Sequence, residues 1–295
     1  MNNLKPLRIL ISGCGFLGQA LGIRFAAEGH RVWGLRRDPS TLPPGIEPLA
    51  GDLRGLQRSD LPAAGFDFVY YLLSSRREDR DGYLFAHHGG VVRMLQLLGE
   101  LPAPRRFFLA SSTRVYGDRA GAWVSEETPT TPWDWTSEAL LCGEEALLES
   151  SIPGTVVRFS GIYGPGRDRL LVQVARGEAA YDVSRAEYTN RIHVEDAAEA
   201  LYLLAERTLD EEIADLYLVT DNEPVDRGVL LEWLTARLAA PQPRWYRSGE
   251  TAPAGKRCSN LLIRKAGFHP TYPTWREGYG SMLRKVDPAL LRGRG

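Results

Sequence analysis

The sequence predicts an α/β fold, a doubly wound parallel sheet with a smaller C-terminal lobe. Three observations predict it. A Gly-rich turn joins the first apolar run to a helix-like stretch, short apolar runs then alternate with helical periodicity, and this alternation weakens from about residue 160 onward. Near-continuous apolar strands between amphipathic helices are typical of a parallel sheet that is covered on both faces.

The alternation can be followed in order along the chain. We expect strands at Leu7–Ile11, Arg31–Leu35, Phe68–Leu73, Arg106–Ala110, Thr155–Phe159 and Leu216–Thr220. We expect helices at Phe16–Ala27, Tyr83–Leu98, Glu138–Leu148, Val194–Glu206 and Val229–Leu238. Because crossovers between parallel strands are right-handed, a doubly wound sheet is the simplest topology.

The weakening of the pattern predicts a division of the chain. Residues 1–160 and 188–222 are expected to form the domain built on the sheet, and residues 161–187 and 223–295 a smaller substrate-binding lobe. Ligands of such sheets bind outside the carboxyl ends of the strands. We therefore expect a small-molecule substrate to lie between the two parts.

Composition and charge exclude several classes of protein. The 36 Lys and Arg nearly balance the 37 Asp and Glu, so no strong field attracts nucleic acid or a membrane surface. The 3 cysteines are scattered without ligand spacing, which predicts neither a metal site nor a disulfide framework and favours a cytoplasmic location. No stretch reaches the roughly 18 apolar residues of a membrane span.

The Gly-rich turn, S-G-C-G-F-L-G, is the most informative motif. It has G-x-G-x-x-G spacing, follows a predicted strand and opens a predicted helix, the context of a dinucleotide site. Gly13 permits a tight turn, Gly15 lets a pyrophosphate approach the backbone, and Gly18 lets the helix pack on the strand. The free N–H groups at the helix start, at Phe16 and Leu17, favour phosphate. The alternative is a tight turn without a ligand.

The end of the second strand discriminates between cofactors. NAD enzymes usually place an acidic residue there, whereas this chain has Arg36 and Arg37. An arginine fork suits a phosphate, so we expect NADP rather than NAD. The alternative is that both arginines are solvated surface residues. Further cofactor contacts are expected from Asp52 and Leu53, which follow another short strand after Arg31–Leu35, and from Leu73 and Ser74, at the end of the strand Phe68–Leu73.

Three later motifs carry a resemblance to a known family. They are S-S-T-R-V-Y-G at 111–117, R-F-S-G-I-Y-G-P-G at 158–166 and R-I-H-V-E-D at 191–196. With the Rossmann-type turn they resemble the extended short-chain dehydrogenase/reductases, of the NAD-dependent epimerase/dehydratase kind, over residues 7–285. The resemblance implies an oxidoreductase or epimerase that acts on a nucleotide sugar or a related carbonyl or hydroxyl compound. It places Ser111 at the cofactor and Ser112 where it polarises the reacting carbonyl.

Two departures mark the chain as an atypical relative. Its Gly-rich turn is one residue shorter than the extended family's, and no tyrosine is followed four residues later by lysine. In the family's Y-x-x-x-K pair, the lysine lowers the pKa of a tyrosine that is otherwise near roughly 10. Thr136 and Leu140 fall in those two places and cannot do this work. We name Tyr116 and Tyr163 as the catalytic candidates that could substitute for the family's tyrosine.

The C-terminal region adds candidate substrate contacts. G-K-R-C-S-N at 255–260 resembles a segment of the atypical branch, and its cations suit an anion such as a nucleotide-sugar diphosphate. The expected substrate contacts are Arg191, His193, Lys256, Arg257 and Asn260. The alternative is a solvated loop, and for His193 a structural role.

Two hypotheses of function stay open from the sequence. One is an NADP-dependent enzyme, and the other is a catalytically inactive NADP-binding sensor or regulatory protein. A homodimer through the predicted helices Tyr83–Leu98 and Glu138–Leu148 is a further hypothesis, although covering the sheet explains their apolar faces equally well.

Overall fold

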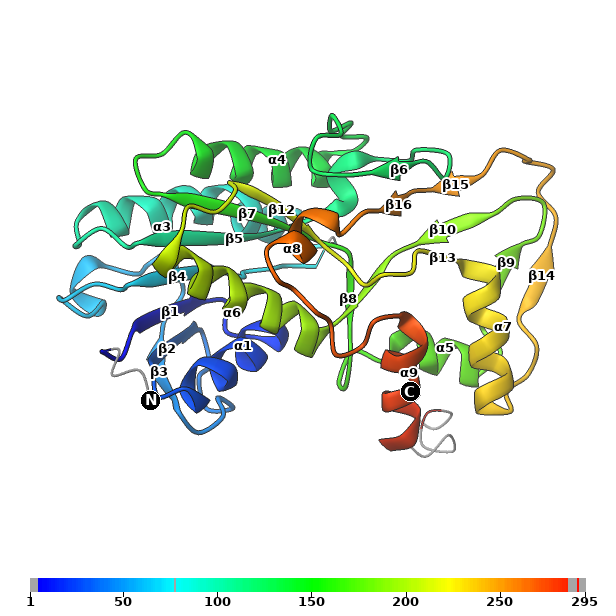
Figure 1. Ribbon diagram of the computed structural model, residues 1–295, viewed down its shortest axis with the longest axis horizontal. Coiled ribbons are helices and arrows are strands. Elements are labelled where there is room, and N and C mark those ends of the chain that lie inside the picture. Colours follow the sequence, from blue (N-terminus) through cyan, green and yellow to red (C-terminus); the bar gives the residue numbers. More distant parts are fainter. Residues whose placement is uncertain (1–4, 77, 286–290, 292–295) are drawn as a thin grey trace.

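A seven-stranded parallel sheet forms the centre of the protein (Figure 1). The computed structural model describes residues 5–76, 78–285 and 291. The strand order is β12-β7-β5-β4-β1-β2-β3, which confirms the predicted doubly wound sheet. The strands are β1 (Arg8–Ser12), β2 (Arg31–Arg36), β3 (Ile46–Ala50), β4 (Phe68–Tyr71), β5 (Arg106–Ser112), β7 (Gly154–Phe159) and β12 (Leu216–Val219).

The order of the strands reverses at β1. From β1 the chain runs outward through β2 and β3, then returns to place β4 on the other side of β1. Ser12 at the end of β1 is level with Leu35 of β2 and Tyr71 of β4. The crossovers diverge at this point, and such a switch leaves a crevice at the carboxyl ends of the strands.

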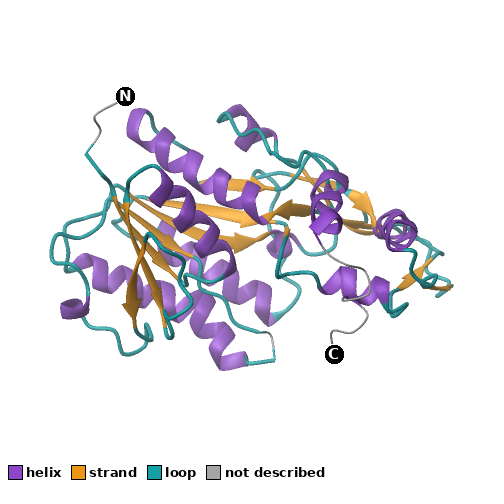
Figure 2. Cartoon of the chain, turned by 90° about the horizontal axis from the view of Figure 1, so that it is seen from below, coloured by secondary structure: helices purple, strands orange, loops and turns teal. Residues whose placement is uncertain are grey.

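Helices cover both faces of the sheet (Figure 1 and Figure 2). On one face, α1 (Phe16–Ala27) packs beside α6 (Val194–Asp210), and on the other lie α3 (Gly90–Gly99) and α4 (Trp135–Leu148). The apolar run of β1 serves both layers, because successive strand residues point to opposite faces. The first layer takes Ile9 and Ile11, and the second takes Leu10, all fully buried.

The helix predicted at Tyr83–Leu98 is divided into three pieces. They are α2 (Arg80–Leu84), a π-helical turn η2 (Phe85–Gly89) and α3. The buried hydroxyl of Tyr71 donates to the carbonyl of Ala86 (2.9 Å) within the π-helical turn.

The start of α4 also differs from the prediction. The helix begins at Trp135, three residues before the predicted Glu138. Asp134 caps it, since its carboxylate accepts from the N–H of Ser137 (2.9 Å). The added turn brings Thr136 into the helix and buries it.

The C-terminal region forms smaller sheets around an apolar cluster of its own. Leu230, Leu234 and Trp275 are fully buried there, in the interior shared by α5, α7 and α9. The helices are α5 (Arg169–Ala175), α7 (Arg227–Leu238), α8 (Leu261–Lys265) and α9 (Trp275–Lys285). The sheets are β13-β10-β15, β11-β8, β14-β9 and β16-β6, built from β6 (Trp123–Val124), β8 (Gly161–Tyr163), β9 (Ala180–Asp182), β10 (Glu187–Thr189), β11 (Arg191–His193), β13 (Val225–Asp226), β14 (Arg244–Tyr246), β15 (Ala254–Gly255) and β16 (Arg257–Cys258).

Candidate active site

A cavity of about 610 Å³ opens at the switch point of the sheet. Its walls come from the Gly-rich turn, the ends of β2, β4 and β5, the segment α2–η2, and α4. Most of the residues predicted to contact a cofactor lie along it. They are Gly13, Gly15, Phe16, Leu17, Arg36, Arg37, Asp52, Leu53, Leu73, Ser74 and Ser111, and the predicted catalytic Ser112 lines the same cavity.

The three glycines of the turn stand in different surroundings. Gly13 has φ +84°, and a Cβ there would lie 2.6 Å from the backbone nitrogen of Leu73. At Gly18 a Cβ would lie 2.9 Å from Cγ2 of Ile11, so this glycine lets α1 pack on β1 and does not line the cavity. A Cβ on Gly15 would meet no atom nearer than 3.9 Å and would have open space before it.

Two observations show that the turn fits a phosphate-bearing dinucleotide. The hydroxyl of Ser12 lines the cavity, is buried, and has no hydrogen-bond partner among the described residues. Helix α1 starts with no side-chain cap and no acidic residue in its first turn, so its terminal N–H groups are available to an anion. A phosphate group would satisfy both.

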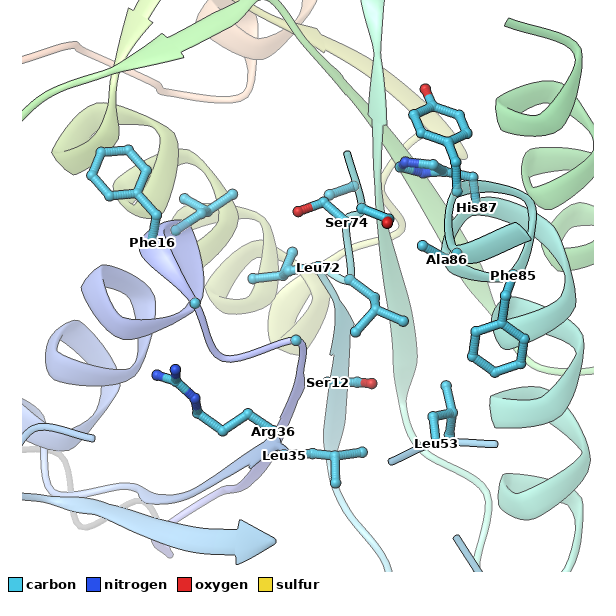
Figure 3. Close-up of a pocket in the computed structure, with 18 of the residues that line it drawn as sticks. Ser12, Phe16, Leu35, Arg36, Leu53, Leu72, Ser74, Phe85, Ala86 and His87 are labelled. Carbon is cyan, nitrogen blue, oxygen red and sulfur yellow. The ribbon is translucent and has the colours of Figure 1, made fainter. Parts of the chain in front are cut away.

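Arg36 stands at the end of β2 beside this turn. It is half-buried and its Nη1 donates to the carbonyl of Cys14 (3.4 Å), while Arg37 is exposed. Figure 3 shows Arg36 below the turn, with Phe85, Ala86 and His87 across the cavity on η2. The cationic end and the η2 end therefore lie on different sides of the cavity.

The hydroxyl of Tyr116 is held in a buried polar network outside the cavity. Arg158 Nη1 donates to it (3.0 Å), and Arg158 Nη2 forms an ion pair with Glu144 (2.5 Å). Ser111 donates its hydroxyl proton to the same carboxylate. Burial raises the pKa of Tyr116, against a smaller opposing effect of Arg158. The structure thus places this predicted catalytic candidate away from the cavity wall.

Tyr163 and His193 lie together at the junction with the C-terminal cluster. The ring of Tyr163 stacks on Tyr279 with centroids 4.4 Å apart, and burial raises its pKa. His193 accepts the N–H of Glu195 (3.4 Å) through Nδ1 at the start of α6, and burial lowers its pKa. Neither residue is in the cavity lining.

Three other predicted substrate residues connect the segment 256–260 to earlier loops of the chain. Lys256 donates to the carbonyl of Gly117 (2.8 Å), and Arg257 donates to that of Gly121 (2.6 Å). The amide of Asn260 donates to the carbonyl of Thr220 (3.1 Å). These three side chains lie outside the cavity lining.

Arg191 keeps an unused donor in the same region. Its Nε is buried without a partner among the described residues, and so is Oδ2 of nearby Asp221. Burial raises the pKa of Asp221 to about 8. The pair lies beside the stacked tyrosines and outside the cavity lining.

Thr136 and Leu140 stand at the two positions that the resemblance assigns to the family's tyrosine and lysine. Thr136 is buried and accepts from Nε of Arg114 (2.7 Å), which also pairs with Asp134 (2.5 Å). Leu140 lines the cavity with an apolar side chain. Along the described part of the chain, no group of three His, Cys, Asp or Glu side chains could hold a metal ion.

Sequence reasoning missed two polar aromatic residues in the cavity. Tyr83 and His87 line it from α2 and η2, with ring centroids 4.2 Å apart. Burial lowers the pKa of His87 to about 4, so its imidazole is neutral at neutral pH. Their spacing of four residues puts both on one face of the predicted helix, and this was the available signal.

Fold and cavity together define a Rossmann-type protein with a ligand cleft at its switch point. The model of the NAD dependent epimerase/dehydratase family matches residues 9–219, and the chain belongs to this family. Among the helices of the described residues, none is long and apolar enough to cross a membrane.

Relatives and solved structures agree with this assignment. The chain is 27% identical to 3-diazoavenalumate denitrifying reductase of a Streptomyces species, over 93% of this chain and 99% of that protein. A Methylobacillus flagellatus structure described as an NAD-dependent epimerase/dehydratase is 32% identical, with TM-score 0.78 over 95% of this chain and 99% of that one. MoeE5, solved with UDP-glucose and NAD, has TM-score 0.80 at 22% identity, covering 96% and 99%.

Proposed function

We propose that the protein binds NADP and is an oxidoreductase or epimerase of a nucleotide sugar or a related carbonyl or hydroxyl compound. The observation that carries the proposal is one cavity that contains the Gly-rich turn, the cations of β2 and Ser112. A dinucleotide laid along it would have its phosphates at Gly15 and its far end beside Ser112. MoeE5, a structural neighbour, was solved with a UDP-sugar and NAD, which supports the choice of substrate class.

The chain's own groups would bind and orient the reactants. When bound, NADP supplies or accepts the hydride at its nicotinamide ring. The N–H groups at the start of α1 would hold the pyrophosphate, and the Ser112 hydroxyl would donate to the substrate oxygen and polarise its carbonyl. We propose that residues 161–187 and 223–295 hold the remote part of the substrate.

A catalytically inactive NADP-binding sensor is the second candidate. It is favoured by the apolar Leu140 at the cavity and by the positions of Tyr116 and Tyr163 outside it. A positioned general acid contributes roughly 10²–10⁴-fold to a rate, so its loss would be costly for an enzyme.

The homodimer through α3 and α4 also stays a prediction, which light scattering tests.

Arg36 is expected to set the cofactor preference. Replacing Arg36 with Ala should weaken NADPH binding about tenfold or more, because a hydrogen bond to a charged group contributes about 1.5–3 kcal/mol. NADH affinity should change little, since NADH lacks the 2′-phosphate. Fluorescence titration of both cofactors measures this, with Arg31→Ala as control, because Arg31 is on the same strand but pairs with Glu47. Equal affinities of the natural protein for NADPH and NADH would contradict the proposal.

Ser112→Ala separates the enzyme from the sensor. With a substrate found by screening NADPH oxidation over carbonyl compounds and nucleotide sugars, we expect kcat to fall about 10²–10³-fold, as for the loss of one donor to a developing oxyanion. NADPH affinity should be retained. A panel without any turnover, together with NADPH binding, would favour the sensor instead.

A further inference from the structure

The cavity contains a polar side chain that the proposed function has not used. We propose that His87 hydrogen-bonds the hydroxyls of the nicotinamide-side ribose, a contact that the apolar Leu140, at the position the resemblance gives to the family's lysine, does not offer. This inference rests on the proposed NADP binding. Its first support is location, since His87 lines the cavity together with Ser112 and Leu140. In Figure 3 it lies across the cavity from Arg36. With its 2′-phosphate at Arg36, a dinucleotide would extend toward Ser112 and His87.

The second support is the facing helix α4. The resemblance assigns Leu140 to the lysine's place, and its side chain lines the cavity without any hydrogen-bonding group. Gly143 follows one turn later, and a Cβ there would lie only 1.9 Å from the carbonyl oxygen of His87. The backbone of His87 therefore packs closely against α4, one turn from Leu140. His87 of η2 can hydrogen-bond the ribose hydroxyls, whereas Leu140 of α4 offers them only methyl groups.

The third support is that the position of His87 is fixed before any ligand binds. Tyr71 donates to the carbonyl of Ala86 (2.9 Å), the residue just before His87, and holds the π-helical turn. Burial raises the pKa of Tyr71, so its hydroxyl remains a donor. The imidazole itself contacts the ring of Tyr83 at 4.2 Å. π-Helical turns occur frequently at functional sites.

The chemistry of a half-buried, neutral imidazole suits a pair of ribose hydroxyls. With its pKa lowered to about 4, His87 has one N–H donor and one nitrogen acceptor at neutral pH. A hydroxyl can both donate and accept, so either tautomer can make the contact. A neutral group also avoids the cost of burying a charge at this half-buried position.

The test compares NADPH with a ligand that lacks the nicotinamide half. His87→Phe keeps the aromatic contact with Tyr83 but removes both hydrogen-bonding nitrogens. We expect NADPH affinity to fall about five- to tenfold, the loss of one to two neutral hydrogen bonds, whereas affinity for adenosine 2′,5′-bisphosphate stays unchanged. His88→Ala is the matched control, because His88 is the exposed neighbour on η2 and is outside the cavity lining.

The outcomes separate this inference from the proposed function. If the natural protein binds NADPH and His87→Phe binds it equally tightly, the inference is overturned while NADP binding stands. An equal loss for both ligands would show that His87 only supports the fold, which also overturns it. If the natural protein binds neither ligand, the proposed function itself fails. Should His87→Phe not fold, His87→Leu is measured, because it also removes both hydrogen-bonding nitrogens, and we expect it to weaken NADPH binding while leaving the bisphosphate unaffected.

Discussion

Replacing Glu144 with Ala is expected to lower the free energy of unfolding by about 3–5 kcal/mol. Glu144 is 4% exposed and Arg158 is 7% exposed, and their ion pair is 2.5 Å long. Without the carboxylate, a guanidinium is left charged and buried, and the hydroxyl of Ser111 loses its acceptor. The loss of stability comes from leaving the Arg158 guanidinium and the Ser111 hydroxyl unpaired, and not from losing the attraction between the two charges.

Two control variants make this measurement specific. Glu47→Ala removes an exposed partner of Arg31 and should cost no more than about 1 kcal/mol. Replacing Glu144 and Arg158 together with Leu should recover much of the loss, because no charge is then left unpaired. Denaturant unfolding of the three variants gives the free energies. A loss below about 1 kcal/mol for Glu144→Ala would contradict the role of the buried pair.

The buried pair also explains why Tyr116, although it belongs to a matched motif, lies outside the cavity lining. The S-S-T-R-V-Y-G segment is local, so the sequence predicts both its strand and the turn that follows. Whether the Tyr116 hydroxyl faces the cleft depends on Glu144 and Arg158, which come from α4 and β7. Arg158 binds that hydroxyl and keeps it in the interior. Contacts between segments this far apart leave no periodic trace in the sequence.

The sheet was predictable for the opposite reason. The strand interior Ile9–Ile11 is fully buried by layers on both faces, so its continuous apolar run is a direct record of its surroundings. The sequence pattern did not predict the π-helical turn η2, because the helical periodicity of the apolar residues continues through it. The bond from Tyr71 to Ala86 joins β4 to the π-helical turn. His87 was missed because the cavity wall that it joins is assembled from η2, β5 and α4, which only the fold brings together.

Within the site, the cofactor end was more accessible to sequence reasoning than the catalytic end. The spacing of Gly13 and Gly15 and the arginine at the end of β2 are consequences of one contiguous strand-turn-helix-strand unit. The other end is assembled from β5, α4 and η2, which are distant in sequence. Ser111 and Ser112 of that end were named as candidates and line the cavity wall, whereas Tyr83 and His87 were not named.

The glycines of the turn give the sharpest test of cofactor binding, because the structure assigns each a different constraint. Gly15→Leu should weaken NADPH binding at least about a hundredfold, the loss of roughly two charge-assisted hydrogen bonds from a displaced pyrophosphate. The melting temperature should hardly change, since a Cβ there would meet no atom nearer than 3.9 Å. Fluorescence titration and thermal unfolding measure the two quantities on the same sample.

The other glycines should respond in the reverse way. Gly18→Leu would drive a side chain into Ile11 and lower the melting temperature, because α1 could no longer pack closely on β1. Gly99→Leu, at the end of α3 with no atom within 4 Å, should leave both binding and melting temperature near their natural values. If Gly15→Leu bound NADPH normally, the phosphates would have to lie elsewhere, and the cavity would need another ligand. A loss of stability at Gly15 without a loss of binding would likewise show that this glycine serves packing.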